Sequence, residues 1–257
     1  MASVQDIFGY RVPKIVGTKT ETSKAVGIEV ELERVYTLDA VTPWNIVDDG
    51  SLKDNGREFT LAVWHDNAKE YLDYLFKHIR KPKISSRCSV HIHANVCDFT
   101  EVQLKTLIVL YIIYEEALYN FSGRRWNSNF CVPVRTHLTT DLKNIDFSNM
   151  SYVFPKYSGL HFFPDDKLGT VEFRHMAGTT NIDYIVDWIN IITALTSYAK
   201  ETDYTHLINR INNMYSDSSY WELAKEIFGD YYKVINYNDF KESAEHGILL
   251  VKLLSEE

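Results

Sequence analysis

Polar and apolar residues alternate in three short segments of the chain, and this alternation predicts three β-strands that each carry one charged face. The segments are residues 27–33, 89–94 and 170–175. Residues two apart on a strand share a face, so the carboxylates, imidazoles and a guanidinium point to one side and the apolar residues to the other. Such a charged face makes a poor hydrophobic core and a good metal and anion site.

Hairpin turn signals join further apolar segments to these strands. Asp54-Asn55-Gly56 is a strong turn signal, and residues 164–169 form a second one. The strands expected from the pattern are 25–36, 44–49, 57–63, 87–97, 157–163 and 169–176. Hairpin turns favour antiparallel pairing between these strands.

Helical spacing of apolar residues predicts several helices between and after the strands. Thr100 to Gln103 form a capping box, Asp66 is expected to cap a second helix, and Asn181 is expected to begin a third. The helix that begins at Thr100 is nearly apolar over 107–113, which predicts burial against the back of the sheet. The expected helices are 66–80, 100–121, 181–199 and two or three within 205–257.

The order of these elements predicts an α+β fold. We expect a curved antiparallel sheet, shaped like a bowl, with helices packed on its outer face. Residues 1–24 are expected to form an irregular lead-in, residues 25–200 the core, and residues 201–257 a C-terminal helical extension of the same domain.

The bulk composition narrows the expected location and partners. The chain has 257 residues, of which 45% are hydrophobic, and a net charge of −8, so binding to a nucleic-acid backbone is not expected. The first twenty residues have no signal-peptide pattern, and the longest apolar run, 107–114, is too short to span a bilayer. Three cysteines leave one without a partner in any disulfide scheme, which favours reduced thiols and a cytoplasmic protein.

Each charged pair on the three strands has an ordinary explanation as well as a functional one. Glu29 and Glu31 suit the solvent face of an edge strand. His91 and His93 have a common metal-ligand spacing, but surface pairs of this kind are equally ordinary. Their occurrence on strands of one predicted sheet, together with the Glu172-x-Arg174 pair, favours a functional site.

A zinc site is the first alternative, because Cys88, His91, His93 and Cys97 are four potential ligands. The strand geometry opposes it. Cys88 faces away from His91, and Cys97 lies about 13 Å beyond His93 at ~3.3 Å per residue. The other available ligands are mostly carboxylates, which favour Mg²⁺ or Mn²⁺.

Three further segments have open interpretations. Glu58 shares a face with Thr60 and offers another carboxylate to the same surface. Arg124 and Arg125 are suited equally to capping the C-terminus of the long helix and to binding phosphate. The segment 48–51 has the composition of a simple turn.

Taken together, these segments resemble the amidoligase family, carboxylate–amine ligases with a glutamine-synthetase-like catalytic domain. The resemblance spans about residues 25–200, and its most specific parts are the His-x-His strand and Thr-Val-Glu-Phe-Arg-His with its following Gly-Thr. The matching segments, in the family's order, are Gly27-Ile28-Glu29-Val30-Glu31, Asp49-Gly50-Ser51 with Gly56-Arg57-Glu58, Cys88 to His93, Arg124-Arg125, and Gly169 to His175 with Gly178-Thr179.

The resemblance implies a chemistry and a set of residue roles. ATP would phosphorylate a small-molecule or peptide carboxylate, and an amine would displace phosphate from the acyl phosphate to leave an amide. The implied ligands of Mg²⁺ or Mn²⁺ are Glu29 and Glu31 (to two different metals), Glu58 and Glu172, and His91 is implied as a metal ligand or a phosphate contact. The implied nucleotide and phosphoryl contacts are His93, Arg124 or Arg125, and Arg174, with Arg174, Glu172 and Glu58 closest to the chemistry.

The chain also departs from the family. Thr170 stands where glutamine synthetases carry an arginine, Ser89 stands where a glycine is usual, and Glu58 is not followed by Ser-Pro. These departures leave the metal ligands in place and concern substrate recognition, which we expect in residues 44–65 and 122–151.

Two other functions remain open alongside the ligase. One is an oxygenase or hydrolase of a small β-barrel type that uses His91, His93 and a carboxylate around one iron or zinc ion. The other is a binding module without catalytic activity. The oligomeric state is open in each case.

Overall fold

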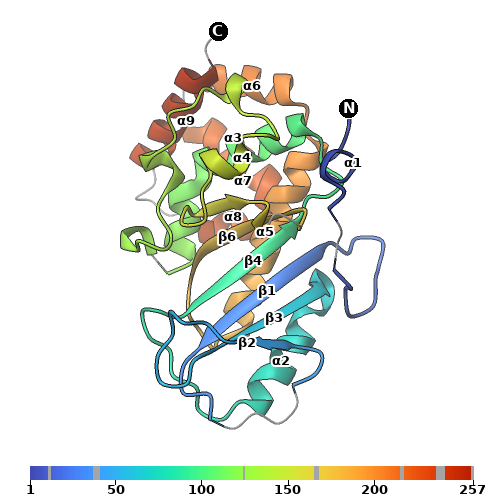
Figure 1. The fold of residues 1–257 in the computed structure, drawn as a ribbon. Helices are drawn as coiled ribbons and strands as arrows, with labels where there is room; N and C mark the ends of the chain where they lie inside the picture. The colour runs from blue at the N-terminus through green and yellow to red at the C-terminus, as the bar shows by residue number, and fades with distance from the viewer. Residues whose placement is uncertain are drawn as a thin grey trace.

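A six-stranded antiparallel sheet is the centre of the fold. The computed structural model describes residues 1–10, 13–36, 41–123, 125–164, 168–214, 217–235 and 241–255. The strands follow the order β2-β3-β1-β4-β6-β5, and every neighbouring pair is antiparallel (Figure 1). Their bounds are β1 Ala25–Leu32, β2 Asn45–Val47, β3 Arg57–Trp64, β4 Ser89–Asn95, β5 Leu160–Phe162 and β6 Thr170–Ala177.

The register of the sheet aligns the charged residues of neighbouring strands. Glu29 of β1 is paired with His91 of β4, and Glu31 of β1 is paired with Glu58 of β3. β1 therefore has a hydrogen-bonded neighbour on both sides, and the interpretation of Glu29 and Glu31 as solvent-facing residues of an edge strand is wrong. The alternate residues of β1, among them Ile28 and Val30, are fully buried on the opposite face.

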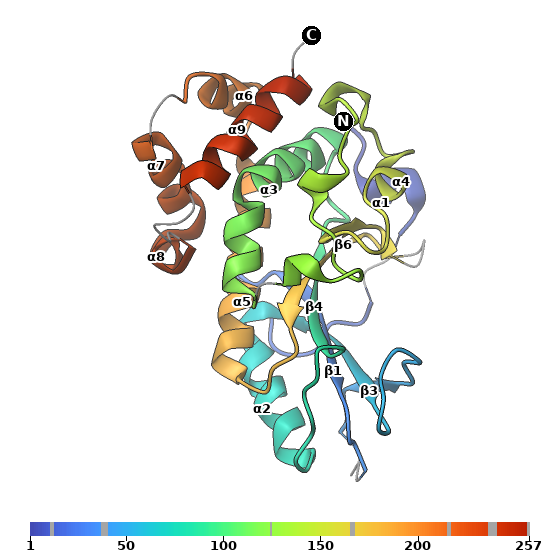
Figure 2. The same cartoon turned by 90° about the vertical axis from the view of Figure 1, so that its left-hand side faces the viewer.

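Helices cover the apolar face of the sheet in two layers. Figure 2 shows α2, α3 and α5 on one side of the strands, and α3 in turn contacts α6, α8 and α9. The helices are α1 Val4–Phe8, α2 Ala68–His78, α3 Glu101–Phe121, α4 Met150–Val153, α5 Ile182–Glu201, α6 Tyr204–Asn212, α7 Asp217–Phe228, α8 Tyr232–Ile235 and α9 Lys241–Ser255. This arrangement confirms an α+β fold with helices packed behind an antiparallel sheet.

The long helices begin where their capping residues predict. The Thr100 hydroxyl accepts from the Gln103 N–H at 3.3 Å, and the Gln103 carboxamide oxygen accepts from the Thr100 N–H at 2.8 Å. The Asn181 side chain accepts from the Tyr184 N–H at the start of α5. α3 is buried on nearly all sides, as its apolar sequence predicts, because the sheet covers one side and helices cover the others.

Two local predictions at the N-terminal end are wrong. Residues 1–24 are not wholly irregular, since they include α1, where the Ser3 side chain and the Asp6 side chain form a second capping box. Asp66 does not cap a helix. Its carboxylate accepts from Thr20 and Ser23 instead, and α2 begins after a short 3₁₀ turn.

The strands and the C-terminal helices also differ in extent from the prediction. β1 ends at Leu32 because Arg34 has a left-handed backbone (φ 58°), which interrupts the extended conformation. Within 205–257, the described residues contain four helices, α6 to α9, rather than two or three. The predicted hairpin turn at 164–169 falls partly on 165–167, outside the described residues, although β5 and β6 pair as a hairpin would require. Among the described helices, none combines the length and the apolar character needed to cross a membrane.

Removal of the capping hydroxyl of α3 should measurably destabilise the protein. Thr100→Ala should lower the free energy of unfolding by about 1 kcal/mol, because the Gln103 N–H loses its acceptor. Urea denaturation should show a lower midpoint with an unchanged slope. Thr100→Ser keeps the hydroxyl and serves as the control; equal midpoints for all three proteins would contradict the role of this capping box.

Candidate functional site

The charged face of the sheet is the floor of a large cavity. The cavity has a volume of about 1120 Å³, and its walls come from segments 84–89, 125–130 and 156–164. The residues predicted from sequence that line it are Glu29, Glu31, Glu58, His91, His93, Arg125, Glu172 and Arg174. Arg124, which was also predicted, lies outside the described residues.

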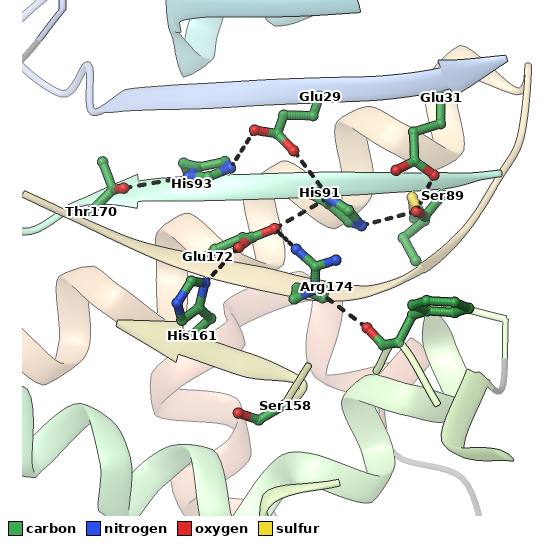
Figure 3. A network of polar contacts seen from close by, with 12 residues as sticks. Glu29, Glu31, Ser89, His91, His93, Ser158, His161, Thr170, Glu172 and Arg174 are labelled. Atoms are coloured by element: carbon green, nitrogen blue, oxygen red, sulfur yellow. Dashed lines mark hydrogen bonds and ion pairs between the residues drawn. The ribbon is translucent and has the colours of Figure 1, made fainter. Parts of the chain in front are cut away.

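Three neighbouring strands supply a first group of candidate metal ligands. One ligand atom each from Glu29 of β1, His93 of β4 and Glu172 of β6 lies within 4.8 Å of the others. His93 Nε2 is buried and lies 2.9 Å from Glu29 Oε1, but without the alignment of a hydrogen bond. The other ring nitrogen, Nδ1, lies 3.3 Å from the Thr170 hydroxyl, which orients the ring (Figure 3).

A second group of three carboxylates lies further along β1. One oxygen each from Glu31, Asp49 and Glu58 lies within 4.8 Å of the others. Glu31 and Glu58 face each other across the β1–β3 pair, and Asp49 reaches them from the loop after β2. Glu29 and Glu31, two residues apart on β1, thus belong to different groups.

His91 lies between the two groups and belongs to neither. Its Nδ1 is 3.0 Å from Glu29 Oε2 and 3.2 Å from Glu172 Oε1. Its Nε2 is 2.9 Å from the Ser89 hydroxyl, which donates to Glu31 at 2.5 Å. Ser89 and His91 therefore connect the two groups through hydrogen bonds, as Figure 3 shows. The assignment of His91 as a metal ligand stays a prediction.

Two arginines lie next to these groups. Arg174 on β6 pairs through Nη1 with Glu172, and its Nε donates to the Phe130 carbonyl at 3.3 Å. Arg125 Nη1 donates to the carbonyls of Arg174 and Met176 at 3.1 and 3.3 Å. Arg125 therefore binds the backbone of β6, and the alternative that it caps the end of α3 is wrong.

The first group carries both signs of charge. Burial raises the pKa of Glu29, but the charge of His93, the hydrogen bond from His91 and the charge of His91 outweigh it and hold the pKa well below its ordinary value. Burial also disfavours the charged form of Glu172, yet the hydrogen bond from His161 and nearby cations keep its pKa at about 2. Burial lowers the pKa of His93, whereas Glu29 and Glu172 raise it to about 9.

The second group, in contrast, has an excess of negative charge. Burial raises the pKa of Glu58, and the charges of Glu29, Glu31, Asp49 and Glu172 add to this, so that its pKa is about 8. Carboxylates that repel one another in this way are stabilised when a cation binds among them.

Both groups have donors that fit a hard divalent cation. Carboxylate oxygens are the preferred ligands of Mg²⁺ and Mn²⁺, and a cation at the first group would displace the proton of His93 and take Nε2 as a ligand. The first group has one histidine and two carboxylates, whereas the single-metal oxygenase needs two histidines and one carboxylate. Neither Cys88 nor Cys97 joins a group of candidate ligands among the described residues.

Three polar residues of the site were not assigned from the sequence. Asp49 lies in a segment with the composition of a turn, and only the tertiary fold brings that turn to Glu31. Ser89 could have been found, since it lies two residues before His91 on the same strand face. His161 on β5 lies 2.9 Å from Glu172, opposite it in the β5–β6 register, which the sequence does not specify.

No family model matches the chain, and no curated protein matches it. Its function is therefore inferred from the geometry of the site.

The raised pKa of Glu58 predicts a specific pH dependence in metal-free protein. Unfolded Glu58 loses its proton near pH 4.5, and folded Glu58 near pH 8, so its contribution to stability decreases as the pH rises between these values. Glu58→Gln removes this contribution. In EDTA, the free energy of unfolding of the variant relative to wild type should increase from pH 5 to pH 8 and then level off.

Urea denaturation at several pH values measures this difference. Glu70→Gln, which changes an exposed carboxylate on α2, is the control and should show no such trend. A constant difference between Glu58→Gln and wild type over the whole range would contradict the raised pKa of Glu58.

Proposed function

We propose that this chain is an ATP-dependent carboxylate–amine ligase with a glutamine-synthetase-like catalytic domain, which uses Mg²⁺ or Mn²⁺. The observation that carries the proposal is the pair of ligand groups on one cavity floor, one around Glu29 and the other around Glu31, with Arg174 beside them. Phosphoryl transfer from ATP needs this combination, because positive charge must offset the charge on the phosphoryl oxygens during transfer.

The proposed reaction has two steps. A carboxylate oxygen of the first substrate attacks the γ-phosphorus of ATP, the bond from this phosphorus to the β,γ-bridging oxygen breaks, and ADP leaves. The nitrogen of an amine then attacks the carbonyl carbon of the acyl phosphate. The bond from this carbon to the phosphate oxygen breaks, phosphate leaves, and the nitrogen gives up a proton to form the amide.

Divalent cations, when bound to the two groups, would offset the charge of the ATP phosphates. The protein's own contribution is to hold its cationic side chains in fixed positions. The Phe130 carbonyl and Glu172 hold the Arg174 guanidinium from two sides, which directs it along the cavity floor. Arg125 is anchored to β6 by hydrogen bonds to two carbonyls and lines the same cavity, so it is our candidate for a second phosphate contact.

The size of the cavity supports a reaction between several substrates. A volume of about 1120 Å³ exceeds the ~300–1,000 Å³ of an ordinary single-ligand pocket, which supports the binding of a second substrate beside ATP. The three cysteines are buried and free, which supports reduced thiols and a cytoplasmic location as part of the proposal.

Nucleotide binding is the first test. Isothermal calorimetry with a non-hydrolysable ATP analogue should detect binding that requires Mg²⁺, and Glu29→Gln should weaken it about tenfold or more. Glu29→Gln is preferable to Glu172→Gln, because the latter would leave Arg174 buried without its carboxylate.

Glu70→Gln on α2 should bind the analogue as wild type does. Absence of binding to the folded wild-type protein, or equal binding in all three proteins, would overturn the ligase proposal. Circular dichroism and thermal unfolding establish that each variant is folded.

Metal stoichiometry is the second test. Titration with Mn²⁺, followed by the electron paramagnetic resonance signal of the free ion, should reveal two sites in the presence of the ATP analogue. Glu29→Gln and Glu58→Gln should each weaken a different site, so the double variant should lose both. If the double variant binds Mn²⁺ no more weakly than one of the single variants, the two groups form one site and the proposed arrangement is wrong.

A further inference from the structure

Two half-exposed aromatic rings lie on the cavity wall, and the backbone carbonyl of one of these residues accepts from Arg174. Phe130 is 52% exposed and Tyr157 is 50% exposed, and both line the cavity. Their ring centroids are 5.8 Å apart and the rings are nearly perpendicular, at 77°. None of the polar contacts described above involves either ring.

The two segments that carry these rings are fastened to each other. The Val132 N–H donates to the Tyr157 carbonyl at 2.7 Å, and the Gly159 N–H donates to the Val132 carbonyl at 2.8 Å. The Gly159 carbonyl in turn accepts from the Arg174 N–H at 3.0 Å. Both rings are therefore presented by backbone that is hydrogen-bonded to the strand carrying Arg174.

Buried polar side chains of α3 hold the Phe130 segment from behind. The Tyr119 hydroxyl donates to the Cys131 carbonyl at 2.9 Å. The Glu115 carboxylate, 1% exposed, accepts from the N–H groups of Val134 and Arg135 at 2.5 and 3.0 Å. A buried carboxylate is costly unless it is hydrogen-bonded in this way, so these bonds fix the segment firmly. The half-exposed Phe130 ring is therefore carried by a segment that these hydrogen bonds hold in place.

Hydrophilic residues lie next to the two rings in the sequence. Ser128, Asn129 and Lys156 line the same wall. In such a cavity, two exposed rings offer an apolar surface that a planar ring can cover by stacked or edge-to-face contact. A ligand without a ring gains less from the same surface.

We propose that Phe130 and Tyr157 bind an aromatic or heteroaromatic ring of the carboxylate substrate. This inference rests on the proposed function, in which Arg174 contacts the phosphoryl group during transfer. The carboxylate substrate is joined to that phosphorus, whereas the adenine of ATP is separated from it by a ribose and two further phosphates. Because the Phe130 carbonyl accepts from Arg174, we assign the rings of this wall to the carboxylate substrate and not to the nucleotide.

Matched acids that differ only in their ring test this proposal. Benzoate is compared with cyclohexanecarboxylate, phenylacetate with cyclohexylacetate, and 3-phenylpropionate with 3-cyclohexylpropionate, by ligand-observed NMR titration with and without Mg²⁺ and the ATP analogue. For wild type, the aromatic member of at least one pair should bind about threefold to tenfold more tightly, the range of an aromatic pair contact. Phe130→Leu and Tyr157→Leu should each reduce this ratio, and the double variant should abolish it.

Tyr152→Leu is the matched control. Tyr152 is 86% exposed on α4 and outside the cavity lining, so its loss should leave the ratio unchanged. The proposal is overturned if no pair shows a preference, if the preference survives in the double variant, or if Tyr152→Leu reduces it equally. Adenosine is titrated as well, because binding of adenosine that depends on Phe130 would assign the rings to the nucleotide and overturn the proposal.

The titration without nucleotide separates this inference from the proposed function. Aromatic preference in protein that does not bind the ATP analogue would retain the ring subsite and overturn the ligase. Binding of the analogue without aromatic preference would retain the ligase and overturn the ring subsite.

Discussion

The antiparallel register of β1 between β3 and β4 is the constraint on which the site depends. It aligns Glu29 with His91 and Glu31 with Glu58, while Ile28 and Val30 enter the core behind them. A shift of one residue would turn the carboxylates into the core and the apolar residues into the cavity, which makes the register strongly specified. The core and the candidate site are therefore fixed by one set of backbone hydrogen bonds.

This constraint brings together charges that are costly to bury. Near Glu172, the histidines and Arg174 offset the carboxylates, so these ion pairs replace part of the lost hydration. Near Glu58, no cationic group is among the main influences on its pKa, and the excess negative charge leaves that end of the floor suited to a bound cation. Apolar residues would make a more stable sheet, and the charged face agrees with the cation binding that we propose.

The helix that fills the core also supports the cavity wall. α3 packs against α5 and α9 through apolar residues, while Tyr111, Glu115 and Tyr119 on the same helix form buried hydrogen bonds towards the site. Tyr111 bonds His175 of β6, and burial together with the charge of Arg125 lowers the pKa of that imidazole to about 3, so it is neutral. A substitution that disturbs α3 would therefore affect both the stability of the fold and the position of Arg174.

The sequence by itself determined the strands with one charged face, the capping box of α3, the start of α5 and an α+β fold, because each depends on residues close together in the chain. It also indicated a set of site residues, because the alternation of polar and apolar residues places each of them on the polar face of its own strand. These residues are Glu29, Glu31, Glu58, His93, Glu172 and Arg174. Only the tertiary structure decided that β1 is central, that Asp49 and His161 join the site, and that Phe130 supports Arg174. These contacts join residues far apart in the chain, and local periodicity carries no information about which strands pair or where loops return.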